Sequence, residues 1–400
     1  MADIEKFRAE TASWLDANAP QSIRGVVITD IEGNWGGRKA TYPNPDMKVW
    51  LDVMAEKGWT SPTWPVEYGG GGLSKEENKV LTQEMTRLRL PAPLVGFGLT
   101  MIGPTLLQFG NDEQKKQHLT AICRGEIRWC QGYSEPGAGS DLASLQMKAV
   151  RDGDDFILNG QKVWTSYADL SDWIFCLVRT NPDVKKQVGI TFILVDMDTP
   201  GVSVVPTGLI SGKSPFCETY FDDVRCPVVN VVHEIDAGWT VAKALLSHER
   251  SMVAGVFGGG RARAKGKRSR LVELADRYVG MREGRIADPV VRDQMAQSEM
   301  DTKSFALTTQ RSADAAKAGQ RPGAESSFFK IYGTELNMRR HELMVRIMGE
   351  RALGWEGPGF EDDELELTRD WLRTRGNSLE GGSNEIQRNI IAKHVLGLPD

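Results

Sequence analysis

The sequence lacks the features that assign chains to several common classes of protein. Its longest apolar runs, such as 173–178, are far shorter than the roughly 20 residues that span a bilayer. The five cysteines form no CxxC pair or disulfide spacing, and the five histidines show no metal-ligand spacing. The net charge of −5 gives no sign of nucleic acid binding. We therefore expect a cytoplasmic protein with reduced thiols and without a metal, a nucleic acid partner or membrane insertion.

At 400 residues the chain is too long for one compact core, and its pattern changes twice. Apolar residues at helical spacing, such as Trp50, Leu51 and Met54, are typical of residues 1–126. Short β-rich runs follow in 127–235, and helical spacing returns in 236–400. This order predicts a mainly α protein with an N-terminal helical domain, a β-barrel-like middle domain and a C-terminal helical bundle.

The β-rich runs of the middle zone are short and separated by turn residues. Asp152-Gly153 is a turn signal between two strands. The expected strands lie within 150–158, 173–178, 190–195, 202–205 and 219–221.

Three separated segments resemble the acyl-CoA dehydrogenase family, in the family's order. They are YSEPGAGSD at 133–141, NGQKVWTS at 159–166 and EGGSNEIQRNII at 380–391, with weaker support from WPVEYGG at 64–70. Within the family, WCQGY at 129–133 and LLSHER at 245–250 are most similar to the large subunits of bacterial pimeloyl-CoA-type and steroid side-chain dehydrogenases. The resemblance implies a C-terminal four-helix bundle and FAD-dependent α,β-dehydrogenation of an acyl-CoA, with electrons passed to an electron-transfer flavoprotein.

The resemblance also assigns cofactor and substrate contacts. It places the backbone at Tyr133 and the Ser134 hydroxyl at the pyrimidine end of the flavin, and the Trp164 ring beside the isoalloxazine. The remaining FAD contacts that it implies are Thr165, Ser166, Ser383 and Glu385. Ser140 corresponds to the residue that touches the pantetheine arm of CoA. Two ordinary interpretations stay open: Trp164 could be a core residue, and Ser140 could cap a helix.

The catalytic base has two candidate positions in this family. The C-terminal loop position is occupied here by Gly381, which cannot accept a proton, although its backbone N–H can polarise the thioester carbonyl. The second position precedes an arginine on a long helix and is matched by Glu249, with Arg250 facing CoA. Glu380 is the reserve candidate, and a solvated helical glutamate is the ordinary alternative for Glu249.

Two family motifs that reach the partner subunit's FAD are altered in this chain. Residues 276–282 read DRYVGMR and residues 346–351 read RIMGER, so neither the Arg-x-x-Phe-Gly nor the Gln-x-x-Gly-Gly pattern is kept. We expect a homo-oligomer, dimer or tetramer, or a heterotetramer with a sister subunit. The alternatives for function are a non-catalytic or half-site subunit and a flavin oxidase or monooxygenase. The chain length, branching and ring content of the acyl group stay open.

Overall fold

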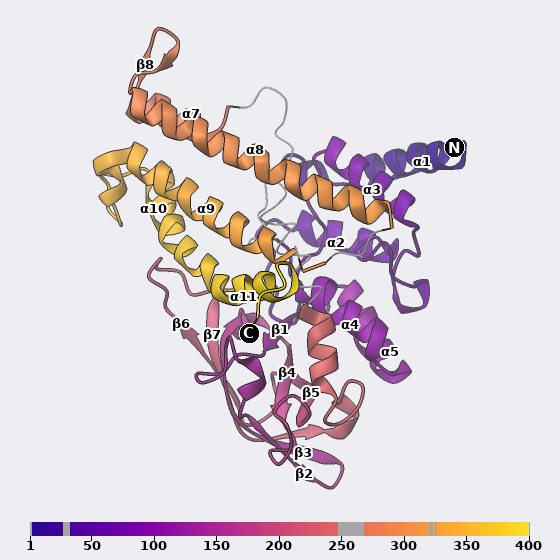
Figure 1. Cartoon of the computed structure of the whole chain (residues 1–400). Coiled ribbons are helices and arrows are strands. Elements are labelled where there is room, and N and C mark those ends of the chain that lie inside the picture. The colour runs from indigo at the N-terminus through magenta and orange to yellow at the C-terminus, as the bar shows by residue number, and fades with distance from the viewer. Residues whose placement is uncertain (1, 27–32, 247–267, 320–322, 325, 400) are drawn as a thin grey trace. The chain divides into compact units, whose positions relative to one another are not determined.

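The computed structural model describes residues 2–26, 33–246, 268–319, 323–324 and 326–399 (Figure 1). The chain divides into two compact units, Met1–Thr207 with Pro215–His248, and Gly208–Ser214 with Glu249–Asp400. Each unit is described by itself. Within the described ranges no helix has the length and apolar character needed to cross a membrane.

The first unit begins with helices whose ends follow from local capping. They are α1 (Ala2–Asn18), α2 (Asp46–Glu56), α3 (Lys75–Arg87), α4 (Gly103–Phe109) and α5 (Asp112–Cys123), with a π-helical turn at Gly98–Ile102. Ser74 and Glu77 form a reciprocal capping box at α3, which satisfies amide groups that have no partner inside the helix. Leu15, Trp50 and Leu81 share one buried core, as the helical spacing predicts.

A seven-stranded sheet follows in the same unit and confirms the predicted β domain. Its strands are β1 (Trp129–Gly132), β2 (Lys148–Asp152), β3 (Asp155–Ser166), β4 (Trp173–Arg179), β5 (Ile190–Asp196), β6 (Val202–Thr207) and β7 (Phe216–Pro227). Their order is β1-β4-β2-β3-β7-β6, with β5 paired to β4. A further helix starts at Gly238 and is described as far as Leu246.

Strands β4 and β5 are buried on both faces, so alternate side chains enter different cores. Phe175 and Phe192 stack at 6.0 Å between ring centroids and join the core that includes α4 and α5. Cys176 and Ile193 face the opposite core, inside the curled sheet. All five cysteines are free and buried, as the absence of disulfide spacing predicts. Because both faces are closely packed, this sheet is a rigid part of the middle domain.

The second unit is helical. It contains α7 (Arg270–Tyr278), a small hairpin of β8 (Met281–Arg282) and β9 (Arg285–Ile286), α8 (Pro289–Lys317), α9 (Ser326–Met348), α10 (Asp362–Thr374) and α11 (Asn384–His394). Short 3₁₀ turns at Gly349–Leu353 and Arg375–Ser378 precede and follow α10. Leu274, Leu343, Ile347 and Leu367 form its core. The predicted α–β–α architecture is confirmed.

Candidate functional site

A buried ion pair fixes the turn that leaves β1. The Lys162 ammonium, which is fully buried, donates to Glu135 Oε1 at 2.7 Å and to the carbonyl oxygens of Tyr133 at 3.2 Å and Leu177 at 2.7 Å. The Glu135 carboxylate also accepts from the backbone N–H groups of Gln146 and Met147. The Lys162 ammonium thus pairs with the Glu135 carboxylate of the turn and also bonds the turn's buried backbone carbonyl at Tyr133.

Burial lowers the pKa of Lys162, and the Glu135 carboxylate opposes that shift by stabilising the charged ammonium. Val163 N–H donates to Ser134 C=O at 2.9 Å, which places two of the motif segments side by side. Lys162 lies within the NGQKVWTS motif at 159–166, although the motif alone gives it no role. A lysine at an inward-facing position of β3, in the same alternation as the buried Phe156 and Leu158, is the signal that could have identified it.

The Trp164 side chain is exposed to solvent rather than buried. Its backbone has φ of 59° and lies where the β3–β7 register shifts between Lys162 and Thr165, so the residue stands on a bulge. The side chain is 59% exposed, and its ring meets that of Phe216 edge-on at 5.9 Å. A bulky residue in the left-handed region is strained, and such strain concentrates at functional sites. The core interpretation of Trp164 is therefore wrong.

Thr165 and Ser166 follow the bulge and differ in environment. Thr165 is fully buried opposite Cys217, and its hydroxyl has no hydrogen-bond partner among the described residues. Ser166 is half-buried and pairs with Phe216 at the end of the strand. Thr165 thus points into the sheet, while Trp164 and Ser166 lie at positions that solvent reaches.

Ser140 lies in an exposed turn beyond the Pro136 and Gly137 segment. It is not the N-cap of the following 3₁₀ turn, where Asp141 stands without a side-chain cap bond. Asp141 instead accepts from Lys186 Nζ and Ser144 Oγ, both at 2.6 Å, which ties the turn to the β4–β5 connection. The capping interpretation of Ser140 is therefore wrong.

A cavity of about 230 Å³ opens beside the same turn. Its walls are Glu135, Pro136, Gly137, Ser144, Gln146, Met147, Gly160 and Gln161. Gly160 has φ of 149°, and a Cβ atom there would lie 2.9 Å from Met147 Cα, so a side chain at this position would clash. The wall of the cavity thus depends on glycine.

The C-terminal loop places Glu380 in a polar cluster. Its carboxylate accepts from Arg373 at 2.8 Å and from Asn377 at 2.5 Å. Gly381 has φ of 64°, and within the described residues its N–H has no acceptor. The reserve base is thus occupied by two donors, whereas the adjacent backbone N–H has no acceptor in the part of the chain that the structure describes.

Ser383 and Glu385 lie at the start of α11. Ser383 is the N-cap, and its hydroxyl accepts from Ile386 N–H at 3.3 Å. Glu385 is exposed in the first turn, with Arg388 at 3.7 Å. The hydroxyl already has a structural function, and the glutamate side chain is open to solvent.

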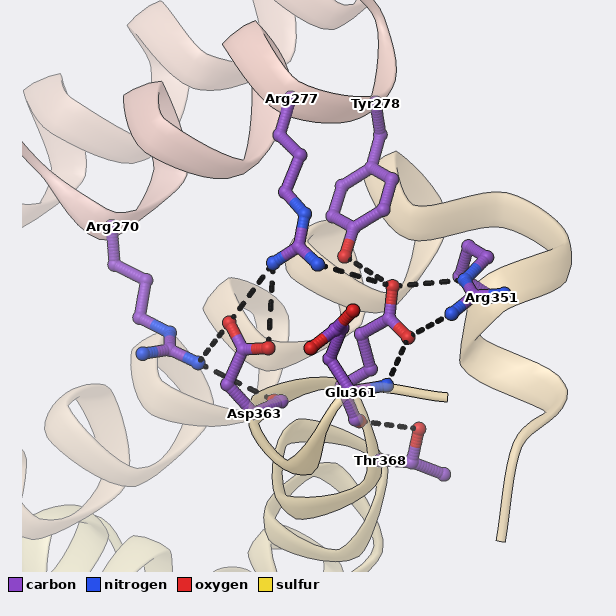
Figure 2. Close-up of polar contacts among 8 residues, drawn as sticks. Arg270, Arg277, Tyr278, Arg351, Glu361, Asp363 and Thr368 are labelled. Carbon is purple, nitrogen blue, oxygen red and sulfur yellow. Dashed lines mark hydrogen bonds and ion pairs between the residues drawn. The ribbon is translucent and has the colours of Figure 1, made fainter. Parts of the chain in front are cut away.

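Two altered motifs converge on one carboxylate in the second unit (Figure 2). Glu364, which is almost fully buried, accepts from Tyr278 Oη at 2.6 Å and from Arg351 at 2.9 and 2.5 Å. The Arg351 hydrogen bonds are the main cause that holds the pKa of Glu364 at about 2. Arg277 pairs with Asp363 at 3.2 Å and lies 3.6 Å from Glu364. Both arginines are therefore engaged within this chain.

Glu249 and Arg250 lie outside the described residues. No group of three or more histidine, cysteine or acidic side chains in the described ranges could hold a metal ion. What the structure brings together is the Tyr133–Glu135 turn and the Val163–Ser166 segment. It presents an exposed indole face and half-buried hydroxyls at 134 and 166, which fit the flat ring and polar edge of a flavin.

Comparison with known proteins places all three zones in one family. Models of the acyl-CoA dehydrogenase N-terminal, middle and C-terminal domains match residues 21–126, 130–224 and 236–396. Acyl-CoA dehydrogenase IpdE1 of Mycobacterium tuberculosis is 37% identical over 402 residues, covering 100% of this chain and 99% of the relative. FadE26 of the same organism is 34% identical, covering 99% and 97%.

Solved structures agree with this assignment. The Tcur3481-Tcur3483 steroid acyl-CoA dehydrogenase superposes with a TM-score of 0.74 at 32% identity, covering 100% of this chain and 98% of the other. The ChsE4-ChsE5 complex of Mycobacterium tuberculosis gives a TM-score of 0.71 at 30% identity, with the same coverage. With three domain models in order and relatives matched along their whole length, this chain belongs to the acyl-CoA dehydrogenase family, whose members are flavoprotein oxidoreductases.

Proposed function

We propose that this protein binds FAD and removes two hydrogens from the α and β carbons of an acyl-CoA, giving the trans-2-enoyl-CoA. The observation that supports it most is the joined pair of motif segments, where Val163 bonds Ser134 and Trp164 stands exposed on a strained bulge. The backbone at Tyr133, the Ser134 and Ser166 hydroxyls, and the Trp164 ring hold the isoalloxazine. Thr165 supports this wall from inside the sheet, while Ser383 and Glu385 serve the rest of the cofactor.

The chemistry needs a base, an acceptor and donors to the thioester oxygen. FAD supplies the acceptor for the β-hydrogen, and an electron-transfer flavoprotein takes the electrons onward. The Gly381 N–H, which has no acceptor among the described residues, polarises the thioester carbonyl and makes the α-proton more acidic. Glu249 takes that proton, Ser140 contacts the pantetheine arm and Arg250 lies toward CoA.

Glu249 is favoured over Glu380 as the base because the Glu380 carboxylate is held by Arg373 and Asn377. A carboxylate whose oxygens are bonded to two donors is turned toward them and away from a substrate carbon, so it is poorly placed to act as a base. Glu249 matches the second base position of the family by sequence.

A paired substitution tests this assignment. Glu249→Gln should keep its flavin and lose at least about 100-fold in turnover, because an amide cannot accept the proton. Glu380→Gln, as the matched control, should lose much less. Turnover is measured anaerobically from flavin bleaching with a panel of acyl-CoA esters. The reverse ranking of the two variants would assign the base to Glu380.

The named relatives support a proposal for the substrate class and the assembly. A relative at 32% identity is named a steroid acyl-CoA dehydrogenase, and two of the matched structures carry paired names that indicate two different polypeptides. Here Arg277 and Arg351 are engaged by acidic residues of their own chain, at motifs that reach the partner's FAD in other members. We therefore infer a steroid-derived acyl-CoA as substrate and a heterotetramer with a sister subunit. Mass in solution and flavin per chain, with and without the sister chain, test the assembly.

A further inference from the structure

Helix α9 carries a polar stripe that faces the C-terminal loop. Lys330, Thr334 and Asn337 recur at four and three residues, so they share one face of the helix. Thr334 is fully buried and Lys330 is 6% exposed. Buried polar groups destabilise a helix interface unless their partners are fixed, so this stripe calls for a specific explanation.

Several partners of this stripe lie in one short loop or directly before it. Lys330 Nζ donates to Ser378 C=O at 3.1 Å and to Asn384 Oδ1 at 2.8 Å, so one ammonium holds both ends of residues 378–384. The Thr334 hydroxyl donates to the α9 carbonyls of Lys330 at 2.7 Å and Ile331 at 3.0 Å, and its oxygen lies 3.4 Å from Asn384 Oδ1. Asn337 donates to Asn377, which in turn donates to Glu380. The loop is thus bonded to α9 in addition to the contacts that its own segment makes through Arg373 and Asn377.

The segment that Lys330 brackets contains Glu380, Gly381 and Gly382. Gly381 and Gly382 have φ of 64° and 83°, so this backbone is unlike regular structure and needs outside support. From α11, the side-chain amide of Gln387 donates to the Gly381 carbonyl oxygen at 3.4 Å. Two charged donors therefore support the loop: Arg373 bonds the Glu380 side chain, and the Lys330 ammonium bonds a residue at each end of the segment.

We propose that Lys330 is a positioning residue whose ammonium fixes the backbone of loop 378–384, and with it the Gly381 N–H that meets the substrate. The catalytic part of this inference rests on the proposed function, whereas the support of the loop does not. Among the described residues no carboxylate pairs directly with Lys330. The carboxylates of Glu335, Glu380 and Glu385 interact with its charge electrostatically from farther away. Glu335 is itself paired with Arg388, and Glu380 with Arg373.

Hydrogen exchange in the protein without cofactor tests the support itself. Leu379 and Glu380 N–H both donate to Gly376 C=O, at 2.9 and 3.1 Å, and report on the fold of the loop. In Lys330→Met these amides should exchange about tenfold faster or more, the factor that loss of a charged hydrogen bond implies. Lys303→Met, at an exposed lysine of α8, is the matched control and should leave them unchanged.

Exchange in Lys330→Met within about twofold of the parent would overturn the proposal. Should that variant fail to fold, Asn384→Ala removes one acceptor of the same ammonium and should show a smaller acceleration in the same direction. No acceleration in Asn384→Ala would also overturn it.

The flavin-loaded protein tests the catalytic part. Lys330→Met should lower kcat per bound flavin about tenfold with KM changed much less, because the N–H acts mainly on the developing charge. A fall in flavin content with normal kcat per flavin would leave Lys330 purely structural and overturn the catalytic part. A parent protein that oxidises no acyl-CoA would refute the proposed function and leave the exchange result intact.

Discussion

Two buried lysines hold the two motif regions of this chain, and they do so differently. Lys162 in the β domain bonds a full carboxylate, that of Glu135, together with two backbone carbonyls. Lys330 in the helical unit bonds one carbonyl and one side-chain amide oxygen. The charge of Lys162 is thus balanced by a carboxylate in direct contact. The charge of Lys330 is balanced only by dipoles and by more distant carboxylates.

The difference bears on what sets the pKa of each ammonium. Burial lowers the pKa of both lysines, but for Lys162 the adjacent Glu135 opposes the shift. For Lys330 burial is the main cause of a fall to about 8, since its acids are farther away. The ammonium in the sheet thus has a carboxylate in direct contact that opposes the effect of burial on its pKa, whereas the ammonium in the helical unit has none and its pKa is about 8.

The largest effect is expected from breaking the first support. Glu135→Gln leaves the Lys162 ammonium buried without a carboxylate, which typically costs about 3–5 kcal/mol. Denaturant unfolding measures the loss, and flavin retention should fall with it. Adding Lys162→Met should recover much of the stability. Asp141→Asn, which breaks the exposed pair with Lys186, serves as control and should change little.

The next effect is a pH dependence of the unfolding free energy that comes from Lys330. The pKa of Lys330 is about 8 in the folded protein and about 10.4 unfolded, so the unfolded chain binds more protons in between. Stability then rises with pH in this window. Relative to Lys330→Met, the parent should gain about 2 kcal/mol in unfolding free energy from about pH 8 to about pH 10. A difference that stays flat with pH contradicts the titration of this lysine.

The smallest effect is expected from substituting Trp164, the exposed residue of the β-domain site. At φ of 59° a residue with Cβ is strained by about 1–2 kcal/mol, so Trp164→Gly should be more stable than Trp164→Ala by about 1 kcal/mol. Both variants should lose flavin during dialysis, because the indole face is gone. Thermal unfolding and the visible spectrum measure the two quantities. Equal stability of the variants, or retained yellow colour, would count against a strained flavin wall.

The motifs predicted which segments contribute to the candidate site, because the chemistry needs particular residues in a particular order. The segments at 133–141 and 159–166 indicated a flavin wall, and the structure joins them through Val163 and Ser134. The motifs did not reveal that Glu380 is occupied by Arg373 and Asn377, since Arg373 lies seven residues away and its direction depends on α10. They also gave no role to Lys330, which meets its loop across about 50 residues of chain.

The sequence by itself determined the order of the zones, because helical and strand periodicity are local properties, and it determined the family through three motifs. Tertiary structure decided which polar groups are compensated. The bulge that exposes Trp164 arises from the register of β3 on β7, and the engagement of Arg277 and Arg351 by Asp363 and Glu364 arises from packing of α7 and the 349–353 turn on α10. Burial and pairing depend on which segments meet in space, and spacing along a chain does not specify that.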